Sequence, residues 1–226
     1  MLQLGESVLA LIIVEESSGR RYFVTFAAGI ITVTMMQYLY YRCNPAEAED
    51  HAMRRSVSGG FQFFYSLLFY SASLILMGCS FKLILHHYLD EEEKSGQEGA
   101  EEELQEAQRH ITNMFSWSLT ASFLLLDLML VSHRGWVANL SRLNQQGRIH
   151  WGGTICTLGL LVLLVLTASL PAYISNLELL SVAGCLLVLS EVLLRTLGLR
   201  YFPVSKNAAQ VTAPWPNTTE PRSRPH

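Results

Sequence analysis

Four of the charged side chains within long apolar stretches of this sequence are candidates for chemistry, namely Glu6, Asp127, Glu191 and Arg195. An ionised group among membrane-length apolar residues is costly, and such residues commonly mark proton or ion pathways. Glu191 and Arg195 are one helical turn apart with the acid first, the favourable order for an ion pair. The simplest interpretation is a self-neutralised pair. Asp127 is expected at a similar depth, where Arg195 would be able to pair with both carboxylates.

The segment Leu2–Val14 holds Glu6 between Gly5 and Ser7, with no oppositely charged residue in the same apolar run. A carboxylate in this setting has to find a partner on another helix, take up a proton or face water. We expect Glu6 to face the interior of a helix bundle, in a polar cluster with groups such as Gln37 or Asp127.

The composition indicates a membrane protein. Of 226 residues, 50% are hydrophobic and 15% charged, against roughly 25% charged in an average soluble domain. The net charge of −3 is the sum of an acidic stretch, Asp90–Glu106, and a mildly basic remainder. The sequence has no stripe of basic residues, so a nucleic-acid partner is not predicted. The four cysteines lack metal-binding spacing, so neither a metal site nor a cofactor is predicted.

Long uncharged runs predict an all-α, polytopic transmembrane helix bundle. It has five full spans and one partial N-terminal helix, which is shorter than the roughly 20 residues of a span. In the longest span, Gln62, Ser66, Tyr70 and Ser73 share one face, which we expect to pack against neighbouring helices. The predicted transmembrane domain covers residues 1–199, with helices at about 2–14, 22–41, 60–88, 111–132, 152–174 and 177–199, an acidic loop at 90–108 and a disordered polar tail at 200–226.

Basic residues predict the orientation. Alternating the loops places ten lysines and arginines on the side of the two termini and four on the other side. The positive-inside rule then makes both termini cytoplasmic. The sequons at Asn139 and Asn217 would lie in the cytoplasm and stay unglycosylated.

A second group of candidate residues lies in the first cytoplasmic loop, at Asp50, His51, Arg54 and Arg55. It combines an acid, a titratable base and two guanidinium groups. Such a group would suit a lipid headgroup or another loop. Ordinary positive-inside charge explains it equally well.

Leu4-Gly5-Glu6-Ser7, followed by an apolar helix and further spans, resembles the low-temperature-requirement A (LtrA) family. The resemblance extends from Met1 to about Leu199 and includes Tyr38–Tyr41 and Asp50–Arg55. It implies an integral membrane protein linked to growth at low temperature. In that family the motif lies in a central helix, and the N-terminal half is missing here. Either the first helix began upstream or the chain is a short form.

The intramembrane carboxylates predict a non-enzymatic transport or sensing role, with the lipid bilayer as surroundings and a proton or small ion as ligand. Two alternatives remain. One is a structural or scaffold membrane protein whose charges serve assembly. The other is a membrane-embedded enzyme, which the sequence favours less because it shows no activated nucleophile or metal set. The oligomeric state is open.

Overall fold

The computed structural model describes residues 19–45, 51–55, 57–94, 100–134 and 151–201; at a few helix ends it describes the backbone alone. Every regular element in these ranges is helical. The elements are α2 (Arg20–Cys43), α3 (Ala52–Arg55), α4 (Val57–Lys94), α5 (Ala100–Arg134), α7 (Trp151–Tyr173) and α8 (Leu177–Tyr201).

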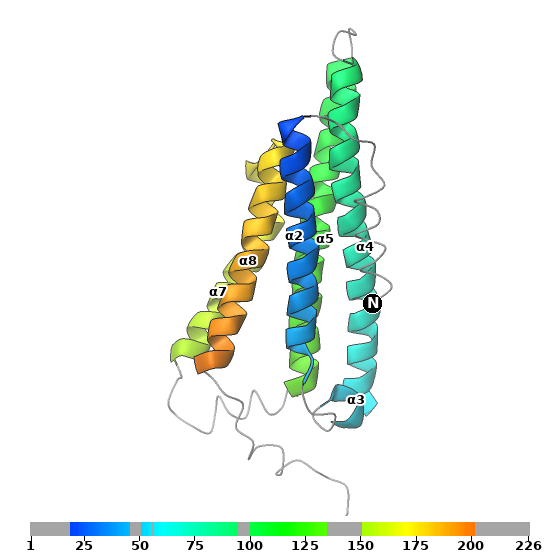
Figure 1. The fold of residues 1–226 in the computed structure, drawn as a ribbon. Coiled ribbons are helices and arrows are strands. Elements are labelled where there is room, and N and C mark those ends of the chain that lie inside the picture. Colours follow the sequence, from blue (N-terminus) through cyan, green and yellow to red (C-terminus); the bar gives the residue numbers. More distant parts are fainter. Residues whose placement is uncertain (1–18, 46–50, 56, 95–99, 135–150, 202–226) are drawn as a thin grey trace, which may run out of the picture.

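The five long helices stand side by side in one bundle, with α2, α5 and α8 running in one direction and α4 and α7 in the other (Figure 1). The helices α4 and α5 pack along their length, α2 packs against α8, and α7 contacts α5 and α8. The short helix α3 lies at one end, hereafter the α3 end, where α2, α5 and α8 finish. The turn between α7 and α8, Ile174–Asn176, lies at the opposite end, hereafter the turn end.

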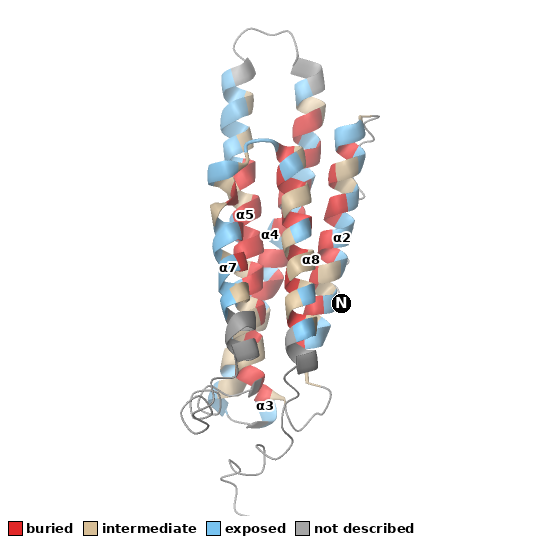
Figure 2. Ribbon diagram, turned by 90° about the vertical axis from the view of Figure 1, so that its left-hand side faces the viewer, coloured by how far each residue is buried: buried red, intermediate tan, exposed pale blue. Residues whose placement is uncertain are grey.

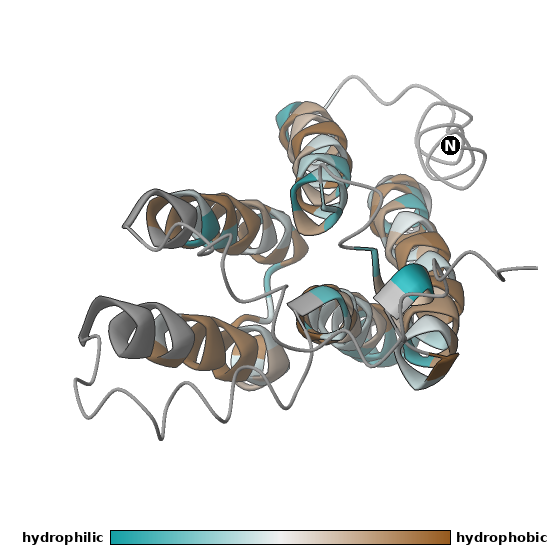
Figure 3. Ribbon diagram, turned by 90° about the horizontal axis from the view of Figure 1, so that it is seen from below, coloured by the Kyte–Doolittle hydropathy of each residue, from teal (hydrophilic) through white to brown (hydrophobic). Residues whose placement is uncertain are grey.

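Among the described residues, four helices are long and apolar enough to cross a membrane, namely α2, α4, α5 and α8. The α7 helix has a shorter apolar part, Leu158–Tyr173, among its described residues. Apolar residues cover outer as well as inner faces (Figure 3), with 65% of Trp117 and 58% of Phe69 exposed. Exposed apolar side chains on every long helix are expected where lipid replaces water. The predicted all-helical membrane bundle is therefore confirmed. The predicted five full spans compare with four in the described residues, because the described apolar part of α7 is shorter than a span.

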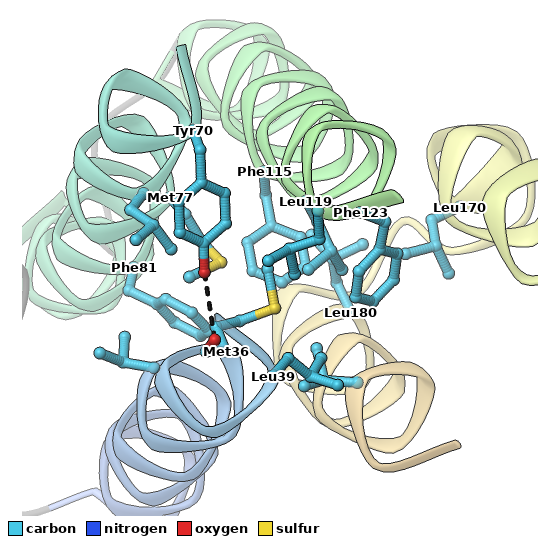
Figure 4. Close-up of a cluster of buried hydrophobic side chains, with 14 of the residues drawn as sticks. Met36, Leu39, Tyr70, Met77, Phe81, Phe115, Leu119, Phe123, Leu170 and Leu180 are labelled. Atoms are coloured by element: carbon cyan, nitrogen blue, oxygen red, sulfur yellow. Dashed lines mark hydrogen bonds between the residues drawn. The ribbon is translucent and has the colours of Figure 1, made fainter. Parts of the chain in front are cut away.

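Buried residues lie on the inner faces of the helices (Figure 2). The core is apolar and aromatic, and it includes Phe81 and Phe115, whose ring centroids lie 5.1 Å apart in an edge-to-face arrangement. Tyr70 on α4 points across this core and donates a hydrogen bond to the carbonyl of Met36 on α2 at 3.1 Å (Figure 4).

Two local features place α8. Asn176 caps its first turn, because its Oδ1 accepts hydrogen bonds from the backbone N–H of Glu178 and Leu179. At Gly184, a Cβ atom would lie 2.6 Å from the ring of Phe115 on α5. Only a glycine allows α5 and α8 to approach this closely.

The acidic stretch predicted as a loop at 90–108 is mostly helical, so this prediction is wrong. The α4 helix continues to Lys94 and α5 begins at Ala100. Within the stretch 90–108, only residues 95–99 lie outside the described chain. Glu102 and Glu103 lie in the first turn of α5. Acidic residues stabilise that end, because the helix dipole places partial positive charge there.

The other predicted helices correspond to α2, α4, α5, α7 and α8 with shifted ends. The α4 helix begins three residues earlier than predicted, and α5 extends far beyond the apolar run. Polar residues continue these helices past the apolar segment, so apolar length alone underestimated them. The partial helix at 2–14 and most of the tail at 200–226 lie outside the described residues.

Candidate intramembrane polar site

Arg195 on α8 joins three helices through its guanidinium group. Its Nε donates a hydrogen bond to Oε1 of Glu191, one turn earlier on α8, at 2.6 Å. Its Nη2 donates to Oδ1 of Asp127 on α5, also at 2.6 Å. Its Nη1 donates to Sγ of Cys43, the last residue of α2, at 3.0 Å. We call these four residues the Arg195 cluster.

The members of the Arg195 cluster differ in exposure. Only 2% of the Glu191 side chain and 7% of the Arg195 side chain are exposed, against 36% of the Asp127 side chain. Charged hydrogen bonds of this length are strong, and they offset part of the cost of removing the charges from water. Asp127 is therefore the member of the ion-pair network most open to exchange with its surroundings.

The formal charges of the cluster do not balance. With both carboxylates ionised, Glu191 and Asp127 carry two negative charges against one on Arg195. One added proton or one monovalent cation makes the network neutral. A buried network with a single surplus negative charge is suited to exchanging such a ligand.

The cluster lies near the α3 end of the bundle. Arg195 is six residues before the end of α8, which corresponds to about 9 Å along a helix axis. Asp127 is seven residues before the end of α5. Two arginines, Arg42 on α2 and Arg54 on α3, lie at the same end of the bundle.

Sequence reasoning placed Asp127, Glu191 and Arg195 together, and the structure brings these three into contact. It did not include Cys43. No local signal marks Cys43, because its partner Arg195 lies 152 residues later in the chain. Glu6, Gly5 and Ser7 lie outside the described residues, so their relation to the cluster stays a prediction.

The second candidate group lies at the α3 end. The rings of His51, Phe63 on α4 and His133 on α5 form a triangle in which each pair of centroids is 4.8 Å apart. The backbone N–H of Ala52 donates to Nδ1 of His133 at 3.2 Å. His51 therefore contacts neighbouring helices.

The structure says less about the other residues of that group. Arg54 is exposed on α3. Asp50 lies outside the described chain, and only the backbone of Arg55 is described. A lipid headgroup or another loop as partner of this group, and ordinary positive-inside charge without a partner, stay predictions.

Hydroxyl groups join the helices elsewhere in the interior. Tyr70 reaches α2, as described above, and Ser73 lies 2.8 Å from Ser122 on α5. The polar face of α4 thus packs against neighbouring helices at these two positions, as the sequence predicted. Nearer the turn end, Thr25 Oγ1 lies 3.3 Å from both Tyr88 Oη and Ser181 Oγ. Such hydrogen bonds fix the pairing of helices in lipid.

The apolar outer faces define an integral membrane helix bundle, and its interior holds a buried charged network. The family described as bacterial low temperature requirement A protein (LtrA) matches residues 1–194. The chain belongs to this family, as the resemblance of its motifs predicted. No curated protein and no solved structure matches the chain.

Proposed function

We propose that this LtrA-family protein is a transport or sensing protein of the membrane, in which the Arg195 cluster takes up and releases one proton or one small cation. The observation that carries the proposal is the pairing of two carboxylates, Glu191 and Asp127, with one buried guanidinium group. The surplus acid gives the cluster a ligand-dependent charge, and Asp127 provides a route for exchange. The proposed role is non-enzymatic.

The proposal includes an orientation. The α3 end carries the greater number of basic residues in the loops, and the positive-inside rule places it in the cytoplasm. The ligand would then enter the Arg195 cluster from the cytoplasmic side through Asp127. Glycosylation at Asn139 or Asn217 in cells would reverse this orientation.

The direct test measures flux. Purified protein is reconstituted into vesicles, and movement of protons or radioactive sodium ions is followed under an imposed gradient. We expect the wild type to move one of these ions. We expect Glu191→Gln and Asp127→Asn to abolish the movement, because neither amide carries the exchangeable charge.

Glu102→Gln is the matched control, since it removes an exposed carboxylate from the same helix as Asp127. This variant should keep the wild-type flux. Glu6→Gln, tested in parallel, asks whether the motif carboxylate takes part. Wild-type vesicles that move neither ion would reject the transport role.

A structural role for the cluster is the competing proposal, because Arg195 links α2, α5 and α8. The two proposals predict different results for Asp127→Asn. If the cluster only holds the helices together, this variant loses thermal stability and keeps its flux. If the cluster exchanges a ligand, the flux is lost in folded protein.

A further inference from the structure

Most buried hydroxyl groups in the described helices are satisfied within their own helix. Each donates to a carbonyl three or four residues earlier, which is the usual solution for serine and threonine in apolar surroundings. Examples are Ser66, Ser71, Ser80, Thr112, Ser122, Ser132 and Thr167.

Among the described residues, two buried hydroxyl groups bond neither within their own helix nor, as Thr25 does, to another helix. Thr32 on α2 is 0% exposed and Ser116 on α5 is 1% exposed. Neither Thr32 Oγ1 nor Ser116 Oγ has a hydrogen-bond partner among the residues that the structure describes. The thiol of Cys185 on α8 lies close to Thr32, and a thiol is at most a weak hydrogen-bond partner for a hydroxyl group.

Helix geometry places the two hydroxyl groups at a similar level of the bundle. Thr32 precedes Cys43 by eleven residues, and Ser116 precedes Asp127 by the same number. Eleven residues make three turns and about 16 Å, so each hydroxyl projects in nearly the same direction as its counterpart. Cys43 and Asp127 both reach Arg195, and α2, α5 and α8 run in one direction.

It follows that Thr32 and Ser116 project from α2 and α5 toward α8, three turns above the Arg195 cluster. The α8 residue at the corresponding level is Gly184, which packs against Phe115, the neighbour of Ser116. Glycine offers no side-chain partner to either hydroxyl. Helix geometry therefore leads us to expect both groups to face the interior bounded by these three helices.

A hydroxyl group left without a hydrogen bond in an apolar interior is destabilising. A buried water molecule that hydrogen-bonds to both hydroxyl groups would remove this destabilisation. Buried water commonly satisfies polar groups of this kind. A bare cation fits less well, since Thr32 and Ser116 supply no negative charge. Water is therefore the chemistry that the two hydroxyls favour.

We propose that the interior between α2, α5 and α8 binds water at Thr32 Oγ1 and Ser116 Oγ. The site lies between the Arg195 cluster and the hydroxyl group of Thr25, which is two turns from Thr32 toward the turn end. Its role as part of a proton route rests on the function proposed above. The water site itself does not.

The sign of a stability change tests the site. Ser116→Ala removes a hydroxyl that binds water in the proposed structure, so the apparent melting temperature of the detergent-solubilised protein should fall by a few degrees. Thr32→Val keeps the side-chain shape and should also lower it. Dry, unbonded hydroxyls would behave in the opposite way, because removing them is neutral or stabilising.

Matched controls separate hydroxyl loss from packing loss. Ser80→Ala removes a fully buried hydroxyl that bonds to the carbonyl of Leu76 in its own helix. Thr112→Val does the same for a bond to Gln108. We expect Ser116→Ala and Thr32→Val to lower the melting temperature at least as much as these controls. An unchanged or higher melting temperature for both test variants would overturn the proposal.

A direct observation completes the test. A wild-type crystal structure that resolves ordered water should show density within hydrogen-bond distance of both hydroxyls. Density that shows a dry interior there would also overturn the proposal. Neither measurement requires flux, so a wild type without flux but with bound water would reject the proposed function and leave the water site in place.

Discussion

Replacing Arg195 by methionine is the most informative perturbation of the polar cluster. Methionine keeps an unbranched stem and removes the guanidinium group, with its contacts to Glu191 and Asp127 at 2.6 Å and to Cys43 at 3.0 Å. Glu191, which is 1% exposed, then remains buried without a compensating charge. Removing one partner of a buried pair costs about 3–5 kcal/mol. That is a large share of a typical stability of about 5–15 kcal/mol.

The assay is thermal unfolding of purified protein in detergent. The fraction that stays folded after heating is measured by size-exclusion chromatography. For a chain of this size, the cost corresponds to a fall in melting temperature of about 6–20 °C. Arg20→Met is the matched control. Arg20 also pairs with a glutamate, Glu178, but at 3.7 Å and with 86% of its side chain exposed. An exposed pair contributes under about 1 kcal/mol, so the control should unfold near the wild-type temperature.

A triple variant distinguishes uncompensated charge from lost packing. Asp127→Leu, Glu191→Met and Arg195→Met together replace the whole charged network by apolar groups of similar size. Such replacements are often neutral or stabilising, so the triple variant should regain most of the lost stability. A single Arg195→Met variant as stable as the wild type would refute the reasoning. If the triple variant is as unstable as the single one, the loss of stability comes from packing and not from uncompensated charge.

Two further predictions concern helix contacts, each measured by the same thermal assay. Gly184→Ala places a Cβ atom 2.6 Å from the ring of Phe115, which should destabilise the bundle by about 1–3 kcal/mol. Gly159→Ala, whose Cβ would meet only the end of a flexible leucine side chain at 3.2 Å, should cost less, and equal losses would contradict the proposed close approach. Tyr70→Phe removes the 3.1 Å hydrogen bond to Met36 and should cost about 0.5–1.5 kcal/mol. A more stable Tyr70→Phe variant would show that this bond does not contribute.

The helices were predictable because their signal is local. Uncharged apolar runs predicted helices at the positions of α2, α4, α5, α7 and α8, and hydropathy of that length has few other interpretations. The acidic stretch was mispredicted because its signal, local charge, is ambiguous. Charge suggests solvent exposure but does not distinguish an exposed loop from an exposed helix, and the backbone of α5 is helical from Ala100.

The candidate site was predictable in part. The spacing of Glu191 and Arg195 places them one turn apart on any helix, so their pairing follows from helix geometry. The contribution of Asp127 came from its depth in a span, which the sequence estimates from the nearest span end. Cys43, Thr32 and Ser116 carried no such signal, because their roles depend on which helices pack together.

From the sequence alone came the membrane class, the positions of the helices and the pair of Glu191 and Arg195, since each depends on residues close together in the chain. Only the tertiary structure decided that α2, α5 and α8 meet at Arg195, and that the side chains of Thr32 and Ser116 are buried. Contacts between helices depend on the packing of faces brought together from distant parts of the chain. The close approach at Gly184 shows this, because its cause is the ring of Phe115 on another helix.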